Sequence, residues 1–229
     1  MNAIGNHLAA IRSAIASAGP DRPVQLLAVS KTQPATAVRA LAAQGQRDFG
    51  ENYVQEAIAK QSELTDPDLC WHLIGPLQSN KCSDAARHFD WIETVDRVKL
   101  IPLLARARPA AAAPLNVLIQ VKLSAERSKS GCAPEQIDAL AEAIVAEPRL
   151  RLRGLMTIGT PWPEPERRRD EFARLRRCFC ALQARYREID TLSMGMSDDF
   201  ALAIAEGATQ VRIGSALFGP RSVSADTKL

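Results

Sequence analysis

The fold of this chain is decided by two nearly continuous apolar segments, Leu115–Lys122 (LNVLIQVK) and Leu152–Gly159 (LRGLMTIG). Strands of a parallel sheet that is covered on both faces have this pattern, whereas strands with one solvated face alternate polar and apolar residues. The segment between them carries apolar residues at helical spacing, at Ile137, Leu140, Ile144 and Val145. A strand, a helix and a second strand in this order predict a parallel βαβ unit.

The same alternation extends over most of the chain. The predicted strands are Val24–Ser30, Arg47–Gly50, Cys70–Gly75, Asp90–Val95, Leu115–Lys122, Leu152–Gly159, Thr191–Met196 and Gln210–Phe218. Strict strand–helix alternation over roughly 200 residues favours a closed (β/α)8 TIM barrel, with an open doubly wound sheet as the alternative. We expect one α/β domain over residues 1–229, with an additional helix over residues 1–19 and a disordered tail over 222–229.

Composition indicates an ordinary soluble protein and excludes several function classes. Of the 229 residues, 46% are hydrophobic and 24% are charged, and the net charge of +3 is too small to indicate nucleic acid or a membrane as a partner. The arginines around Arg167–Arg169 alternate with acidic residues, which predicts a solvated helix face. The histidines are far apart, so we expect no metal site.

Cysteine usage and the amino terminus indicate where the protein works. The five cysteines include no CxxC pair and do not form a disulfide-like pattern, which fits a reducing compartment. The first residues lack a basic start followed by an apolar stretch, so we predict no signal peptide. We therefore expect a cytoplasmic protein.

The first predicted strand ends on Lys31, at the mouth of the predicted barrel. Desolvation at that place lowers the pKa of a lysine, and a neutral amine can form a Schiff base with an aldehyde. Taken alone, this segment favours a solvated lysine at a strand end, so the case for chemistry must come from elsewhere in the chain.

The last predicted strand suggests a ligand for this amine. Gly214 lets the backbone approach an anion closely, Ser215 adds a hydroxyl, and Ser193 and Ser197 follow the neighbouring strand. Arg212 interrupts an apolar strand, either as a structural ion pair inside the barrel or as a partner for a heteroaromatic nitrogen. A Schiff-base lysine, a phosphate cradle and a ring-facing arginine together describe a site for pyridoxal 5'-phosphate.

Sequence blocks in the same order resemble the pyridoxal phosphate homeostasis proteins, the YggS/PROSC family, from about residue 5 to 221. The blocks are Val29–Thr32 (VSKT), Phe49–Tyr53 (FGENY), Trp71–Lys81 (WHLIGPLQSNK), Ser128–Gly131 (SKSG), Leu155–Gly159 (LMTIG), Ser193–Asp199 (SMGMSDD) and Val211–Gly214 (VRIG). The resemblance implies a fold type III barrel like the N-terminal domain of alanine racemase.

The resemblance also implies a set of cofactor-binding residues. It places the Schiff base on Lys31 and the pyridine contact on Arg212. The phosphate ligands it implies are Ser193, Gly214 and Ser215, and the residues lining the ring are Asn52, His72 and Met194. For His72, a hydrogen-bonded histidine of the packed interior is the alternative.

Three functions compete on this evidence. The leading one is a non-catalytic protein of vitamin B6 homeostasis that holds pyridoxal phosphate on its lysine and buffers it or delivers it to apo-enzymes that use it. The second is an amino-acid racemase-like enzyme, which needs an acid/base group on each ring face. In the racemases that this barrel resembles, the second group is a tyrosine from another domain, which we expect this chain to lack. The third, a barrel for another phosphorylated ligand, leaves Lys31 and Arg212 without a shared role. We expect a monomer.

Overall fold

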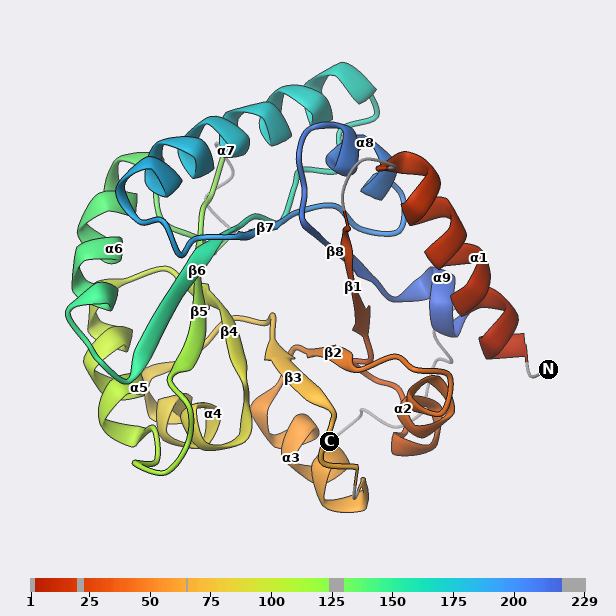
Figure 1. Ribbon diagram of the computed structural model, residues 1–229, viewed down its shortest axis with the longest axis horizontal. Coiled ribbons are helices and arrows are strands. Elements are labelled where there is room, and N and C mark those ends of the chain that lie inside the picture. The colour runs from red at the N-terminus through yellow and green to blue at the C-terminus, as the bar shows by residue number, and fades with distance from the viewer. Residues whose placement is uncertain (1–2, 20–22, 65, 124–129, 220–229) are drawn as a thin grey trace, which may run out of the picture.

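Eight parallel strands close into a barrel in the computed structural model, which describes residues 3–19, 23–64, 66–123 and 130–219 (Figure 1). The strands are β1 (Gln25–Val29), β2 (Asp48–Glu51), β3 (Cys70–Leu73), β4 (Trp91–Val95), β5 (Leu115–Gln120), β6 (Leu150–Met156), β7 (Thr191–Ser193) and β8 (Gln210–Ile213). Each pairs with its neighbours in sequence, and β8 pairs with β1. The predicted TIM barrel is confirmed, and the open sheet is excluded. The predicted tail over 222–229 lies outside the described residues.

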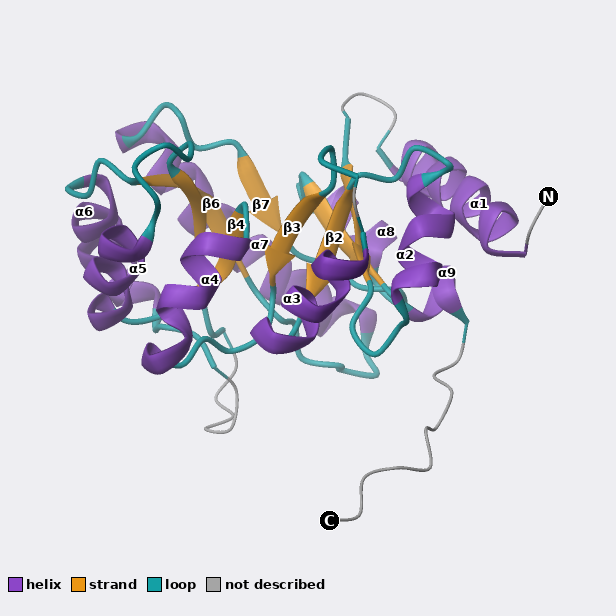
Figure 2. Cartoon of the chain, turned by 90° about the horizontal axis from the view of Figure 1, so that it is seen from below, coloured by secondary structure: helices purple, strands orange, loops and turns teal. Residues whose placement is uncertain are grey.

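Helices surround this barrel, as the views along and across it show (Figures 1 and 2). They are α1 (Ala3–Ala18), α2 (Ala35–Ala42), α3 (Val54–Glu63), α4 (Cys82–His88), α5 (Ile101–Ala107), α6 (Ile137–Val145), α7 (Pro165–Arg185), α8 (Phe200–Ala205) and α9 (Ser215–Phe218). Short 3-10 turns occur at Ser79–Lys81, Val98–Leu100 and Pro134–Gln136. No helix in the described ranges combines the length and the apolar character that crossing a membrane requires.

Two apolar clusters fill the molecule because successive side chains of a strand point to opposite faces. The larger cluster joins the outer faces of the strands to the helices. The smaller one comes from four neighbouring strands and contains Cys70, Trp91, Leu118 and Met156. It packs one side of the barrel interior, so the interior is filled there and the ligand must enter from one end.

The prediction of a strand over Gln210–Phe218 is wrong in its second half. β8 ends at Ile213, and Ser215–Phe218 forms the short helix α9. Gly214 leaves the extended conformation, with φ −121° and ψ −75°, and its carbonyl accepts the amides of the third and fourth residues after it at 2.9 and 3.0 Å. The apolar residues after Gly214 therefore pack as a helical turn.

Several other predicted strands continue too far at their carboxyl ends. β3, β6 and β7 end before Ile74, Ile158 and Met196, and these three side chains line a cavity at the mouth of the barrel. A residue that packs in a strand and one that lines a ligand cavity both appear as apolar positions in a sequence. The pattern therefore could not mark where each strand ends.

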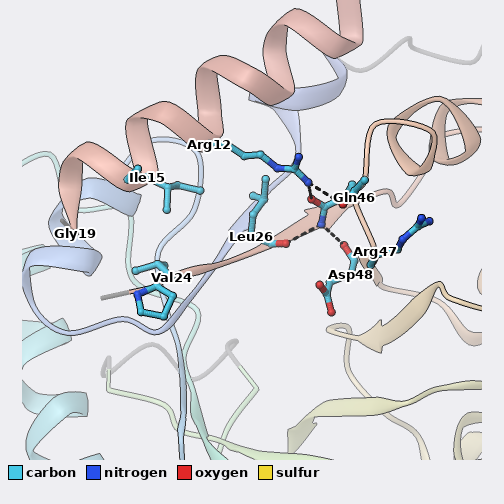
Figure 3. Close-up of a pocket in the computed structure, with 11 residues that line it drawn as sticks. Arg12, Ile15, Gly19, Val24, Leu26, Gln46, Arg47 and Asp48 are labelled. Carbon is cyan, nitrogen blue, oxygen red and sulfur yellow. Dashed lines mark hydrogen bonds between the residues drawn. The ribbon is translucent and has the colours of Figure 1, made fainter. Parts of the chain in front are cut away.

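Arg12 and Gln46 join the additional helix α1 to the barrel at the amino-terminal ends of β1 and β2 (Figure 3). The Arg12 guanidinium donates to the carbonyl of Gly45 at 3.0 Å and to Oε1 of Gln46 at 3.3 Å. The amide nitrogen of Gln46 donates to the carbonyls of Leu26 and Asp48 at 2.8 and 2.9 Å. These residues line a hollow of about 540 Å³, in which the polar groups serve to join α1, β1 and β2.

Candidate functional site

A cavity of about 370 Å³ lies at the carboxyl ends of the strands, where active sites of TIM barrels occur. Residues that follow β1, β2, β3, β6, β7 and β8 line it. Of the eight residues predicted from the sequence, five line this cavity together: Lys31, Asn52, Arg212, Gly214 and Ser215. The hollow beside α1 is larger, but it contains neither Lys31 nor the residues that follow β8. The chemistry of the lining therefore selects the smaller cavity.

The side of the cavity at the ends of β7 and β8 is built from two neighbouring loops. The hydroxyl of Ser215 donates to the hydroxyl of Ser197 at 3.2 Å, so the ends of β7 and β8 present two hydroxyls side by side. A Cβ on Gly214 would lie 3.3 Å from the carbonyl oxygen of Val29 and 3.4 Å from its Cβ. Glycine thus allows β8 to approach β1 closely at the cavity wall.

Arg212 places a guanidinium at the cavity, although its side chain is 4% exposed. Its Nη1 donates to the hydroxyl of Ser193 at 2.7 Å and its Nη2 to the carbonyl of Thr157 at 2.6 Å. Burial lowers the pKa of the guanidinium, while the carboxylates of Glu93 and Asp199 oppose that change. Arg212 is therefore a buried cation with a fixed orientation.

Glu93, which does not belong to any of the motifs quoted from the sequence, is the centre of the polar network below the cavity. This carboxylate is fully buried on β4 and accepts hydrogen bonds from Ser193 at 2.7 Å and from Gln210 at 2.5 Å, and bonds His72 at 2.8 Å. Burial alone would raise its pKa, but the bond to His72 and the charge of Arg212 outweigh burial and lower it. The visible signal was a charged residue inside an otherwise apolar strand.

His72, Ser193 and Met194 do not line the cavity. β7 and β8 are in a register that pairs Ser193 with Gln210, two residues before Arg212, so the Ser193 hydroxyl lies one layer deeper in the barrel. Met194 is buried in the larger apolar cluster. His72 is fully buried and stacks on Trp91, with 5.1 Å between the ring centres. Of the three, Ser193 contacts Arg212, which does line the cavity.

His72 lies in a cluster with Asp48 and Cys70, and its hydrogen bonds decide how that cluster is understood. One ligand atom from each of these three residues lies within 4.8 Å of the others. Burial opposes protonation of His72, but its hydrogen bonds, led by the one to Asp48, outweigh burial and hold its pKa well above 6.5. Both ring nitrogens of His72 already have protein partners, Nδ1 with Glu93 at 2.8 Å and Nε2 with the sulfur of Cys70 at 3.5 Å. We therefore assign no metal to this cluster.

The arrangement suits one kind of ligand. A lysine amine can condense with an aldehyde, hydroxyls and close-packed backbone can hold an anionic group, and a buried cation can face an uncharged heteroaromatic atom. All three features line a single cavity of about 370 Å³, the size of site that takes one small molecule. An aldehyde that carries an anionic group and a heteroaromatic ring would engage all three.

Known proteins resemble this chain over almost its whole length. Residues 1–222 match the family described as alanine racemase, N-terminal domain. The pyridoxal phosphate homeostasis protein of Pseudomonas aeruginosa is 56% identical over 218 residues, which cover 95% of this chain and 94% of that protein. The protein of the same name from Escherichia coli K12 is 49% identical over 232 residues, covering 98% and 99%.

Solved structures show the same architecture. PipY of Synechococcus elongatus, solved without and with pyridoxal phosphate bound, is 43% identical, with TM-scores of 0.87 and 0.84 and coverage of 94% of this chain and 100% of that one. Alanine racemase from Corynebacterium glutamicum shares the fold at 20% identity, with a TM-score of 0.68 over 98% of this chain and 62% of that one. Because its relatives match it over nearly their whole length, this chain belongs to the pyridoxal phosphate homeostasis protein family, whose barrel is that of the alanine racemase N-terminal domain.

Proposed function

We propose that this protein binds pyridoxal 5'-phosphate as a Schiff base on Lys31 and takes part in vitamin B6 homeostasis by buffering the cofactor or delivering it to other proteins. The observation that carries this proposal is the single cavity lined by Lys31, Arg212, Gly214 and Ser215. Pyridoxal phosphate bound to PipY, which is 43% identical to this chain, supports the same assignment.

The residues present fit this cofactor, which supplies an aldehyde that condenses with amines and a ring that withdraws electrons from them. The close approach of β8 to β1 at Gly214 and the paired hydroxyls of Ser197 and Ser215 suit its phosphate. Asn52 lines the cavity beside Lys31, where a ring could contact it. We propose that Ser193 and His72 act below the cavity, by holding Glu93 and Arg212 in place.

Arg212 would control the electronic character of the cofactor's ring. A guanidinium cannot accept a proton from a pyridine nitrogen, so a ring that faces Arg212 stays unprotonated and withdraws electrons weakly. Ser193, Thr157 and Glu93 fix and balance this cation. The same contact is compatible with a racemase, so Arg212 alone does not separate the two functions.

Absorbance spectroscopy tests the binding proposal. Protein mixed with pyridoxal phosphate should develop a yellow Schiff-base band that borohydride bleaches, and mass spectrometry of the reduced protein should find the adduct on Lys31. Lys31→Ala should abolish the band. Lys99→Ala, which removes an exposed lysine that does not line the cavity, should leave it unchanged. A wild-type protein that stays colourless, or an adduct on another lysine, would contradict the proposal.

A second experiment separates a carrier from a racemase-like enzyme. The chain's two tyrosines do not line the cavity: Tyr53 is 62% exposed at the start of α3, and Tyr186 follows α7. We therefore expect loaded protein to show no steady turnover of L- or D-alanine in a chiral assay. Turnover that Lys31→Ala abolishes would instead establish an enzyme.

Delivery can be measured directly. Loaded protein is mixed with an apo-enzyme that needs pyridoxal phosphate, with and without an excess of a scavenger for the free cofactor. Activation that survives the scavenger indicates direct transfer to the apo-enzyme. Activation that the scavenger abolishes indicates that the protein buffers free cofactor and releases it.

Location and assembly complete the proposal. The five cysteines are free thiols, which supports a reducing compartment, and we propose the cytoplasm. We propose that the protein is a monomer. Light scattering coupled to size-exclusion chromatography measures the mass that decides this point.

A further inference from the structure

The backbone on the carboxyl side of Lys31 is held in an unfavourable conformation. Thr32 has a φ of +64°, the only positive φ at a non-glycine residue in the described part of the chain. A β-branched residue in the left-handed region is a true outlier, and such strain persists only where surrounding contacts hold it. The side chain of Thr32 is exposed, so packing of that side chain does not explain the conformation.

Helix α3 supplies the contact that holds Thr32. The amide of Thr32 donates to Oε1 of Glu56 at 2.6 Å. The same carboxylate oxygen accepts a hydrogen bond from the ammonium of Lys60, one turn further along α3, at 2.7 Å. Glu56 thus fixes the peptide that follows Lys31, and Lys60 fixes Glu56.

Lys60 also holds the residue before Lys31. Its ammonium donates to the carbonyl of Ser30 at 2.7 Å and to Oε1 of Glu51 at 2.7 Å, and the hydroxyl of Ser30 donates to the same Glu51 oxygen at 2.5 Å. An ammonium has three N–H donors, and these contacts with Glu51, Glu56 and Ser30 use all three. The Lys60 side chain is 7% exposed, so it cannot exchange these partners for water without moving α3.

These contacts form a clamp around the proposed Schiff-base lysine. We propose that Glu56 and Lys60 are positioning residues, which fix the backbone on both sides of Lys31 and so hold its amine at the cavity in the orientation that reacts with an aldehyde. This inference rests on the proposed binding of pyridoxal phosphate by Lys31, and it adds how the chain prepares that lysine before the cofactor arrives.

A purely structural role would look different. Lys60 and Glu51 alone would tie α3 to β2 without any contact to the loop after β1. The observed hydrogen bonds instead reach the residues immediately before and after Lys31, and one of them supports a strained peptide. Preorganisation of this kind affects the rate of a reaction strongly, because a displacement of about 1 Å can cost roughly 100-fold.

Stopped-flow measurement of Schiff-base formation tests the clamp. Glu56→Ala removes the acceptor of the Thr32 amide, and we expect it to slow the second-order reaction with pyridoxal phosphate by about tenfold or more. Glu56→Gln keeps an oxygen acceptor and should react within about threefold of the wild-type rate. Glu63→Ala, on an exposed residue of the same helix, should react at the wild-type rate.

Thr32→Gly is a control that distinguishes positioning of Lys31 from a general role of Glu56 in stability. Glycine adopts a positive φ without strain, so the turn no longer needs Glu56 to hold it. We expect Thr32→Gly in the Glu56→Ala background to recover most of the lost rate, although it restores no contact with α3. Thermal unfolding of each variant checks that the barrel is intact. If Glu56→Ala does not fold, Glu56→Asp withdraws the acceptor by one methylene while keeping the charge beside Lys60, and should slow the reaction likewise.

The outcomes separate this inference from the proposal on which it rests. A wild-type protein that forms no Schiff base overturns the proposed function itself. A wild-type protein that reacts, with a Glu56→Ala variant that reacts equally fast, overturns the clamp alone. A slow Glu56→Ala variant that neither glutamine at position 56 nor Thr32→Gly restores also overturns it, because the loss would then come from damage to the fold.

Discussion

Replacing Glu93 with glutamine should destabilise the barrel strongly, since Glu93 is the anion between two buried cations. Glu93→Gln keeps the volume of the side chain, but it turns one acceptor oxygen into an NH2 donor and removes the charge that balances Arg212 and His72, which are 4% and 0% exposed. Removing one partner of a buried ion pair costs about 3–5 kcal/mol. Because glutamine can still bond Ser193, we expect a loss near the lower end, about 3 kcal/mol, equivalent to roughly 6–12 °C in the melting temperature.

The loss should depend on pH in a direction that the pKa values fix. The pKa of Glu93 lies below its ordinary 4.5, so its contribution is complete above 4.5 and is lost as the pH falls through the folded value. The pKa of His72 lies well above 6.5, so its contribution is complete below 6.5 and is lost as the pH rises through the folded value. The difference between wild type and Glu93→Gln should therefore be largest between 4.5 and 6.5 and should shrink in alkaline solution.

Urea unfolding of cofactor-free protein, followed by tryptophan fluorescence at a series of pH values, measures this difference. Trp91 stacks on His72 and reports on the same part of the barrel. Glu63→Gln, an exposed carboxylate on α3, is the matched control and should change stability by less than about 0.5 kcal/mol. A loss for Glu93→Gln below about 1 kcal/mol, or one that is the same at acid and alkaline pH, would refute the assignment of charge in this network.

Three further predictions address the attachment of α1 to the barrel, the packing of β6 against β7, and the proposed phosphate site. Gln46→Ala removes the donor from the buried carbonyl of Leu26 and the half-buried carbonyl of Asp48, and it should cost about 1–3 kcal/mol in urea unfolding; an unchanged midpoint would show that these contacts are dispensable. Gly154→Ala should cost about 3 kcal/mol or more, or prevent folding, because a Cβ at this φ of +150° would lie 1.8 Å from the carbonyl oxygen of Thr191; soluble yield and melting temperature check it. Ser215→Ala should weaken pyridoxal phosphate binding by about 0.5–1.5 kcal/mol and leave binding of unphosphorylated pyridoxal unchanged. Equal loss for both ligands in a spectral titration would show that Ser215 does not serve the phosphate.

The fold could be predicted from the sequence because its signals are local. A buried parallel strand requires a short apolar run, and the helix that returns the chain requires apolar residues at helical spacing. Leu115–Lys122 and Leu152–Gly159 contain β5 and most of β6, and the order of runs gave the order of strands around the barrel. The ends of the strands could not be predicted as well. At Gly214 the backbone leaves the extended conformation, and the apolar residues that follow form a helix instead of continuing the strand.

Part of the site also followed from the sequence, by a simple geometric rule. The carboxyl ends of all strands in a barrel meet at one mouth, so residues that end different strands come together whatever their separation in the chain. This rule brought Lys31, Asn52 and Arg212 to one cavity. The rule could not predict how deep in the barrel a side chain lies. A shift of two residues in strand register places a side chain in the layer below the mouth, as it does for Ser193.

The sequence by itself determined the barrel, the family and the lysine at its mouth, since each depends on residue types in a fixed order along the chain. Only the tertiary structure decided which charges meet inside the barrel and what holds Lys31. Glu93 contacts Ser193 and Gln210 across 100 and 117 residues of chain, and Lys60 reaches Ser30 across 30. No local pattern encodes these pairs, because each arises only when the strands have closed and the helix α3 has packed against them.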